Sequence, residues 1–490
     1  MPVLAVSVVL LSSPRTRADD YDYDFFGQWR LVYSHAQDFP LDAASDTSGL
    51  RWYLDHRLDI GTRQSLGDFL SVTAELQIFY GQTAGDFDHI ASEFRNDTRE
   101  TLRGWDLDRF DVRQLWLKWN SPWFQLRIGQ MYSDWGLGML ANDGRPDPDR
   151  FGFRDQGDIS ERLILATRPL AMLSGWPSKI ILALGGGLVY RDENCNLRDG
   201  DLGAEVIGSL FYRDEGIDVG MYVAGRLQED DAGTNLTATA IDLFARIDAG
   251  PGYQGLLLAA ELAILTGSTD RVIQAERPGG VDISAFGAVL RAGWHFGILD
   301  LLPVLEIGYA SGDPDPHDGT VTAFSFDPDY KVGLVLFDTV MRGITAMSAA
   351  ESADPERVGL PLPGTDMLAS RGRISGAIYI NPTVRIRPLS QMTLMAGFLY
   401  AWSSAPFAQS YQTFKNGGVA TNPYGLVNPG RDLGCELDLG VDWKQPIFGH
   451  VDLLGGFQVG WFFPGSAFDY PDGSRPGIIS RFIGRLALEW

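Results

Sequence analysis

Several arginines of this chain fall at alternating positions, which places their charges on one face of an extended segment. Arg385 and Arg387 stand two residues apart, and Tyr379 and Asn381 precede them at positions of the same parity. In a strand, residues two apart point to the same side. A guanidinium group is always charged and presents a planar set of donors suited to carboxylate, phosphate or sugar hydroxyl groups. We predict that these four side chains line a pore and contribute to its selectivity, as charged rings do in channels.

Other segments carry charges of both signs on their polar face, and the sequence leaves two interpretations open. The charged residues could form a selectivity ladder, or they could form cross-strand ion pairs that hydrate and brace a wall. Besides the four residues above, the predicted pore-lining residues are Arg57, Arg127, Arg162, Arg291, Arg485, Glu436 and Asp438.

Residue types that catalyse reactions or bind metals show no spacing typical of an active site. The six histidines are scattered, and Cys195 and Cys435 stand far apart, so neither an activated nucleophile nor a zinc site is indicated. The acidic stretch 313–319 could bind calcium, but it does not meet the EF-hand pattern, and a solvated loop is the favoured interpretation. We predict that the chain is not an enzyme and holds no cofactor or metal.

Composition excludes two classes of protein. The formal net charge of -23 argues against a nucleic-acid partner, because phosphate binding needs clustered basic residues. The sequence contains no apolar run of about 18 residues, which excludes a helical membrane protein. Yet 45% of the residues are hydrophobic and 12% are aromatic, so the apolar residues must belong to another kind of element.

The elements that must position the charged residues are strands. Eighteen amphipathic stretches follow one another, joined by links that are alternately short and long, with the long ones acidic. Strands of about 9 to 11 residues or more cross a bilayer when tilted, and a transmembrane barrel has short periplasmic turns and long external loops. We predict an all-β fold, a single transmembrane antiparallel β-barrel of about 18 strands. Soluble β-sandwiches would show shorter strands, and a propeller would show a repeat of about 40 to 50 residues.

The two ends of the chain carry further signals. Residues 1–18 look like a secretory signal peptide with a truncated basic region, although a buried first strand is an alternative. The predicted barrel domain is therefore 19–490. The last strand stops on an aromatic residue and resembles the C-terminal signature of bacterial outer-membrane barrels, which implies the barrel-assembly machinery as a partner. The residues assigned to this assembly signal are Phe482, Leu486, Leu488 and Trp490.

One irregular segment lies within residues 128–143. Glycines interrupt its alternation at Trp135-Gly136-Leu137-Gly138, and glycines inside a strand suggest a bulge or the close approach of another backbone. We predict that the strand runs over 124–141 and that something folds against the wall there.

The longest loop, 312–372, is the second irregular segment. Its apolar residues from Val332 to Met347 have helical spacing, and an exposed amphipathic helix would be costly. We expect the loop to pack into the barrel mouth as a constriction or lid, while contact with neighbouring protein or lipopolysaccharide is the alternative. The residues assigned to the constriction are Phe326, Asp327, Asp329 and Tyr330.

These two segments also carry a family resemblance. The run 134–143 and the run 326–330, with the apolar stretch after it, resemble an uncharacterised family of large Gram-negative outer-membrane proteins. More loosely, the eighteen-strand plan is similar to alginate-export-type barrels. The resemblance implies the outer membrane of a Gram-negative bacterium, in contact with lipid and lipopolysaccharide. The alginate-export comparison implies an arginine-lined conduit for an acidic polysaccharide.

The predicted function is passive or partner-driven transport. Barrels of 16 to 18 strands leave an aqueous channel, so we predict an outer-membrane channel that carries hydrophilic solutes through a charged, arginine-rich lumen. One alternative is a polysaccharide export conduit that works with periplasmic partners. Another is a non-conducting structural or adhesive barrel that displays acidic loops.

Overall fold

Antiparallel strands account for most of the chain in the computed structural model. The structure describes residues 21–44, 46–49, 52–86, 110–153, 157–248, 250, 254–273, 277–316 and 318–490, so the predicted signal peptide at 1–18 lies outside the described residues. The strands are β1 (Tyr21–Ala36), β2 (Trp52–Leu66), β3 (Leu70–Gly85), β4 (Asp111–Asn120), β5 (Phe124–Tyr132), β6 (Ile159–Thr167), β7 (Ile180–Arg191), β8 (Leu202–Asp214), β9 (Ile217–Glu229), β10 (Asn235–Asp248), β11 (Gly255–Thr269), β12 (Val281–His295), β13 (Leu302–Ala310), β14 (Thr320–Val321), β15 (Ala377–Leu389), β16 (Met392–Ser403), β17 (Asp432–Phe448), β18 (Val451–Pro464) and β19 (Ile479–Glu489).

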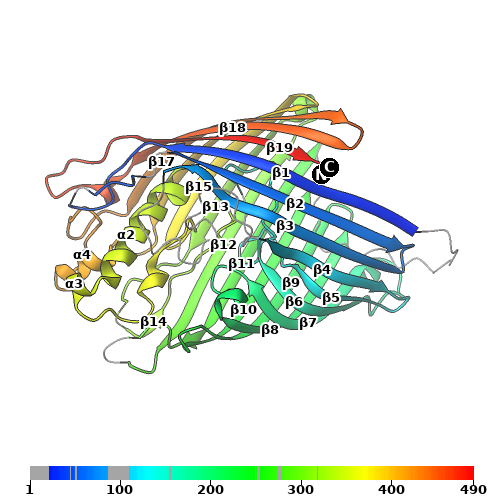
Figure 1. The fold of residues 1–490 in the computed structure, drawn as a ribbon, viewed down its shortest axis with the longest axis horizontal. Coiled ribbons are helices and arrows are strands. Elements are labelled where there is room, and N and C mark those ends of the chain that lie inside the picture. Colours follow the sequence, from blue (N-terminus) through cyan, green and yellow to red (C-terminus); the bar gives the residue numbers. More distant parts are fainter. Residues whose placement is uncertain are drawn as a thin grey trace.

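The sheet closes on itself because its first and last strands pair. β1 is hydrogen-bonded to β2 on one side and to β19 on the other, in a register that runs from Gln28 opposite Glu489 to Ala36 opposite Arg481. The two-residue β14 pairs only with β12, in parallel, and lies outside this ring. The remaining 18 strands form a closed antiparallel barrel (Figure 1). The predicted fold is confirmed.

The alternation of short and long links is also present. Short turns join β2 to β3, β8 to β9, β15 to β16 and β17 to β18, whereas 66 residues separate β13 from β15. The first strand begins and the last strand ends on the short-turn side. There Gly27 and Trp490 exchange two backbone hydrogen bonds of 3.0 and 3.1 Å. The short helices α2 (Arg342–Ala353), α3 (Pro355–Val358) and α4 (Ser410–Lys415) gather at the long-loop end (Figure 1).

One predicted strand is too long. The strand predicted over 124–141 ends at Tyr132, where the chain leaves the wall and enters the lumen. The turn that follows includes Gly136 and Gly138, both with positive φ, a conformation that glycine adopts without strain. The irregularity in the sequence therefore marks the end of a strand rather than a bulge within one.

The outer face of the barrel is apolar and exposed, which in water would be an unusual surface for so large an area. Leu437 and Leu486 are 44% and 42% exposed, and similar side chains cover the middle of most strands. Exposed aromatic rings lie near the short turns, namely Phe69, Trp123, Trp176, Trp294, Phe296, Trp443 and Phe448. Aromatic rings also lie toward the long-loop end, among them Trp52, Phe286, Phe457 and Trp461. An apolar band between two aromatic girdles is the outer face of an outer-membrane barrel.

The closing strand has the two-faced pattern that the sequence indicates. Phe482 lies against the rings of Tyr33, His35 and Phe457, and Trp490 stacks on Phe25 at a ring distance of 6.3 Å. Leu488 lies opposite Trp29. The assignment of this strand to an assembly signal stays a prediction. Among the described residues, none of the helices has the length and hydropathy needed to cross a membrane.

The lumen contains two long chain segments that fold inward. The first insertion is residues 133–158, between β5 and β6, and the second insertion is residues 311–376, between β13 and β15. The second insertion includes a π-helical turn at Leu336–Met341 followed by α2, so the predicted helix is present and begins near the predicted position. Buried apolar residues of both insertions form one core with inward-facing residues of the wall.

The apolar band generates a prediction about Leu243, which lies midway along β10 and is exposed on the outer face. Leu243→Arg should lower the free energy of unfolding in lipid vesicles by about 2–4 kcal/mol, because arginine is costly near the bilayer midplane and much less costly near an interface. Thr239→Arg, on the same face and nearer the long-loop end, should cost about 1 kcal/mol or less. Equal unfolding midpoints for the two variants in a urea titration would contradict this placement of the membrane.

Candidate functional site

The second insertion is held by a carboxylate that projects from the wall. Glu436, on β17, is fully buried and accepts hydrogen bonds from the backbone N–H groups of Leu334, Val335 and Leu336, at 2.5, 2.7 and 2.7 Å. Gly333 has a φ of +72°, and a Cβ at that position would lie 2.8 Å from the Glu436 carboxylate. The glycine therefore lets the backbone turn and approach the wall closely.

The first insertion is held in the same way by β10 and β11. Glu261, on β11, accepts hydrogen bonds from the backbone N–H groups of Leu137 and Met139, and Asp242, on β10, accepts one of 2.8 Å from Trp135 Nε1. A Cβ at Gly136 would lie 2.5 Å from Glu261 Oε2. The segment singled out by its glycines thus crosses the lumen and docks on the wall.

Glu306, on β13, joins both insertions to the wall. Its carboxylate accepts hydrogen bonds from the hydroxyl groups of Tyr330 and Tyr379, at 3.0 and 2.7 Å. It also forms ion pairs with Arg150, at 2.9 Å, and with Arg291, at 3.3 Å. We call Glu261, Glu306 and Glu436 the wall carboxylates. Because each is buried and accepts several hydrogen bonds, they fix the position of the inserted chain.

Arg385 and Arg387, which the sequence favours as selectivity residues, are engaged with acidic partners. Arg385 is buried and pairs with Asp149 of the first insertion and, at 3.4 Å, with Asp300. Arg387 pairs with Asp300 at 2.7 Å. These contacts agree with the alternative in which arginines brace the wall, and here the bracing extends to an insertion.

The other predicted pore-lining residues fall into two groups. In the first group the side chains have close protein partners. Arg57 pairs with Asp59 at 2.6 Å and Arg485 with Asp442 at 2.8 Å. Asn381 donates to the carbonyl of Phe398 at 3.0 Å, and Asp438 is buried beside Glu436. In the second group, Arg127 and Arg162 also have protein partners, since Arg127 donates to Gln125 and Arg162 to Ser133, but their side chains line an open cavity as well.

The residues assigned to a constriction are packed inside the lumen. Phe326, Asp327, Asp329 and Tyr330 are all almost fully buried, and the rings of Phe326 and Tyr330 meet edge to face at 5.2 Å. A role of the second insertion in narrowing the channel stays a prediction, whereas its position within the barrel is observed.

An ion-pair network ties the second insertion to the closing strand. Burial disfavours the charged form of Asp338, but the cations Lys331 and Arg481 outweigh it and hold the pKa of Asp338 well below its usual range. Arg481, on β19, also donates to the carbonyl of Leu334 and the hydroxyl of Thr339, both at 3.0 Å. The polar face of the last strand therefore serves the lumen, while its other face meets lipid.

A cavity of about 220 Å³ lies on the other arc of the lumen, bounded by inward side chains of β2 to β9 and by the first insertion. We call it the basic cavity, because among the described residues that line it six are basic and two are acidic. The basic residues are Arg63, Lys118, Arg127, Arg145, Arg162 and Arg213, and the acidic residues are Asp134 and Asp143.

Two of these cations face each other directly across the sheet. Lys118, on β4, is the register partner of Arg127, on β5. Like charges in directly opposed positions destabilise a sheet, so their placement has a cost to the fold. The Arg127 guanidinium lies 5.4 Å from the centre of the Trp116 ring and donates to Gln125 Oε1 at 3.0 Å. The arrangement can attract and bind an anionic group.

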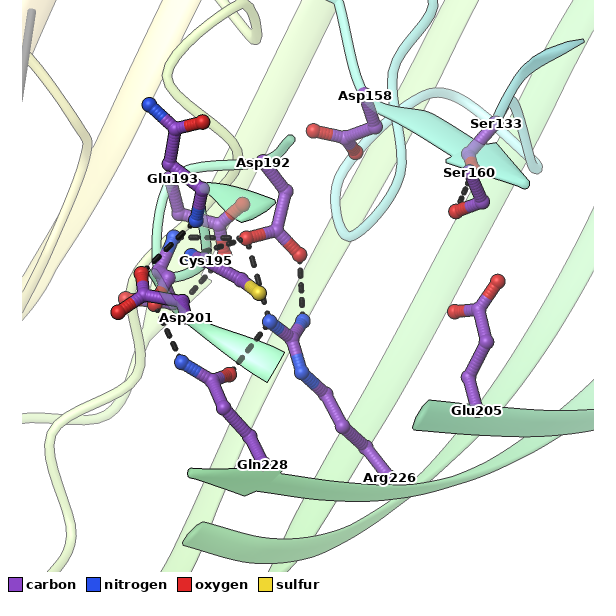
Figure 2. Close-up of polar contacts among 12 residues, drawn as sticks. Ser133, Asp158, Ser160, Asp192, Glu193, Cys195, Asp201, Glu205, Arg226 and Gln228 are labelled. Carbon is purple, nitrogen blue, oxygen red and sulfur yellow. Dashed lines mark hydrogen bonds and ion pairs between the residues drawn. The ribbon is translucent and has the colours of Figure 1, made fainter. Parts of the chain in front are cut away.

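The loop after β7 also folds into the lumen. Asp192 pairs with Arg226 of β9 at 2.5 Å, and Gln228 of the same strand donates to the carbonyl of Asn194 at 2.7 Å (Figure 2). Burial raises the pKa of the Cys195 thiol in this loop to about 11. A buried thiol with a raised pKa is not an activated nucleophile.

Three carboxyl groups from separate loops meet beside this network. Asp158, Glu193 and Asp327 each place an oxygen within 4.8 Å of the other two. Burial, with repulsion from neighbouring carboxylates, raises the pKa of Asp158 and of Asp327 well above the usual range, and it also raises the pKa of Glu193. This carboxyl cluster is the group among the described residues that has the donor set of a metal site.

Comparisons with known proteins find likenesses of structure only. No protein-family model matches the sequence, and no curated protein matches it. Solved structures that are similar include OccK11 (OpdR) of Pseudomonas aeruginosa, with 12% identity, coverage of 95% of each chain and a TM-score of 0.47. OprD of the same organism has 11% identity, coverage of 96% of this chain and 94% of that chain, and a TM-score of 0.46. The outer-membrane channel DcaP of Acinetobacter baumannii has 10% identity, coverage of 96% and 97%, and a TM-score of 0.41.

These likenesses are distant, and the fold assignment rests on the strand pairing of the chain itself. That pairing, the apolar band and the aromatic girdles define an outer-membrane β-barrel. These comparisons show no similarity to alginate-export-type barrels, and that similarity stays an interpretation of the sequence.

Sequence analysis did not predict the docking role of Glu261 and Glu306, the cation pair that includes Lys118, or the carboxyl cluster. Glu261 and Glu306 resemble any other carboxylate on a polar strand face, and Lys118 was not singled out. The sequence did indicate where the insertions contact the wall. Gly136 and Gly333 each lie in an irregular segment, and each lies against a wall carboxylate. Nothing in the spacing of residues 158, 193 and 327 indicates that they meet.

The wall carboxylates generate a prediction about the second insertion. Glu436→Gln replaces one accepting oxygen by a donating amide, so at least one of the N–H groups of Leu334, Val335 and Leu336 loses its partner. Leaving a buried donor unpaired costs about 1–3 kcal/mol. Hydrogen exchange at these amides, measured in detergent micelles, should accelerate by about tenfold. Asp452→Asn, at the partly exposed pair with Lys444, is the control and should leave these amides as protected as in the wild type.

Proposed function

We propose that the chain is an outer-membrane channel for small hydrophilic solutes, that it favours anionic ones, and that the basic cavity is part of the solute route. The observation that carries the proposal is the excess of basic side chains in the basic cavity. Side chains of one charge that surround a pore select ions of the opposite charge. Low-dielectric walls concentrate the field and raise the local concentration of the attracted solute.

The distribution of the inserted chain supports this route. The second insertion docks on β13, β17 and β19 through Glu306, Glu436 and Arg481, whereas β2 to β9 and the first insertion line the basic cavity. Solute passage is therefore directed to one arc of the barrel. Arg63, Lys118 and Gln125 lie close to the short turns, so the cavity is toward the periplasmic side in the usual orientation of such barrels.

The cation pair of Lys118 and Arg127 further supports anion preference. The two side chains are opposed in the sheet and repel each other, and an anion placed between them would relieve that repulsion. The Arg127 guanidinium lies 5.4 Å from the centre of the Trp116 ring and donates to Gln125 Oε1, and these contacts hold its charge beside the cavity.

The proposal predicts the effect of Lys118→Gln with Arg127→Gln on ion selectivity. One interaction between unit charges at 4 Å in water is worth about 1 kcal/mol, and 1.4 kcal/mol corresponds to a factor of ten. Loss of the two charges should therefore lower the anion-to-cation permeability ratio by about 25-fold, and loss of either one by about fivefold. The measurement is the reversal potential of the purified protein in planar bilayers under a potassium chloride gradient.

Arg387→Gln is the matched control, because Arg387 is a lumenal arginine paired with Asp300 and lies outside the basic cavity. It should leave the permeability ratio near the wild-type value. A larger effect of Arg387→Gln than of the double variant would favour the selectivity site suggested by the sequence. A wild-type protein that conducts no ions under any applied potential would contradict the channel and support a structural or adhesive barrel.

A further inference from the structure

We propose that the carboxyl cluster of Asp158, Glu193 and Asp327 is a binding site for one divalent cation, with the properties expected of a calcium site. Each residue comes from a different inward-folded loop. Asp158 ends the first insertion, Glu193 lies in the loop after β7, and Asp327 lies in the second insertion. A cation bound there would fasten three loops together at one point.

The distances between the three carboxylates fit a shared ion. One oxygen of each lies within 4.8 Å of the other two. Calcium binds oxygen at 2.3–2.6 Å, so two oxygens on opposite sides of one ion are separated by about 5 Å. The donor set consists of carboxylate oxygens, which hard cations such as calcium prefer and zinc does not.

A buried oxygen without a partner points independently to a ligand. Asp327 is 3% exposed, and its Oδ1 accepts a hydrogen bond of 2.7 Å from the Asp329 backbone N–H. Its Oδ2 is buried and accepts no hydrogen bond from an N–H group or a hydroxyl of the described residues, and the side chain that it meets is another acid, Asp158. Buried polar atoms in folded proteins are nearly always paired, and an unpaired one indicates a group such as an ion.

The remaining oxygens are held in place by the surrounding chain. Asp158 Oδ2 accepts a hydrogen bond of 3.1 Å from the Asn142 backbone N–H, and Glu193 Oε1 accepts one of 2.7 Å from Asn194 Nδ2. Figure 2 shows Asp158 directed toward the loop that carries Asp192 and Glu193. Such outer contacts orient the ligands of metal sites.

The charges around the cluster leave room for a divalent cation. The neighbouring Asp192 is paired with Arg226, and Asp329 accepts a hydrogen bond from the Gly157 N–H at 2.7 Å. Arg373 acts on Glu193 and Asp327, and Arg226 also acts on Glu193; the Arg373 guanidinium donates to the carbonyl of Ser370 at 3.0 Å. With all carboxyl groups ionised, five negative charges stand against three positive ones, so two remain for one calcium ion to neutralise. The acids are Asp158, Asp192, Glu193, Asp327 and Asp329, and the cations are Arg226, Arg371 and Arg373.

The test uses the full-length barrel, purified in detergent at neutral pH and stripped with EDTA, with Tb³⁺ as a luminescent probe for calcium sites. Tb³⁺ should bind saturably, and Ca²⁺ should displace it at lower concentration than Mg²⁺, with a dissociation constant of roughly 10⁻⁴–10⁻³ M, as for extracellular calcium modules. Asp327→Asn should weaken Tb³⁺ binding by about tenfold or more.

Two controls keep the result interpretable. Asp472→Asn removes an exposed carboxylate from the loop after β18 and should bind Tb³⁺ as the wild type does. Glu193→Gln is a second cluster variant, for use if Asp327→Asn fails to reach the heat-modifiable folded form on gels. Absence of saturable Tb³⁺ binding would mean that the carboxyl groups are neutralised by protons alone and would overturn the proposal. Unchanged affinity in a folded cluster variant would overturn it as well. Both readouts are independent of conductance, so neither result depends on the channel function.

Discussion

The pairing of β1 with β19 is the contact on which the rest of this structure depends. A bilayer core offers no water to backbone N–H and C=O groups, so a sheet that crosses it must have no open edge. The register from Gln28–Glu489 to Ala36–Arg481 removes that edge. Closure also fixes which side of every strand meets lipid, because successive side chains point to opposite faces. The apolar band outside and the charged lumen inside are two consequences of this one constraint.

The charged groups of the lumen need hydrogen-bond partners, and the insertions supply many of them. Carboxylates that face a closed interior need partners, and the backbone of an inserted loop needs acceptors for its N–H groups. Glu436 and Glu261 meet both needs, since each wall carboxylate accepts hydrogen bonds from inserted backbone. Glu306 accepts hydrogen bonds from side chains of both insertions, namely Arg150 of the first and Tyr330 of the second. The wall carboxylates are therefore docking points, whereas the cations of the basic cavity line open space besides contacting the wall.

The lumen therefore has one arc filled by inserted chain and one arc that holds the basic cavity. Inserted chain occupies the arc near β13, β17 and β19 and contributes an apolar core that fills that part of the lumen. The basic cavity occupies the arc of β2 to β9. A barrel of this size would otherwise have a wide and unselective pore. On the proposed route, the insertions fill one arc and a solute passes close to charged side chains. The carboxyl cluster lies where the first and second insertions meet the loop after β7.

The sequence by itself determined the eighteen strands and their inward and outward faces, because these depend on local alternation and on the lengths of the links. It favoured inward packing of the longest loop but left contact with neighbouring molecules open. It also located the two irregular segments at Gly136 and near Val332. It did not determine which charges bind each other. Arg385 and Arg387 meet Asp149 and Asp300, and Asp158, Glu193 and Asp327 meet across three loops. Only the tertiary structure decided these contacts, since the energy of a charge depends on neighbours that are distant in sequence and on burial, and neither is encoded in the spacing of residues along one strand.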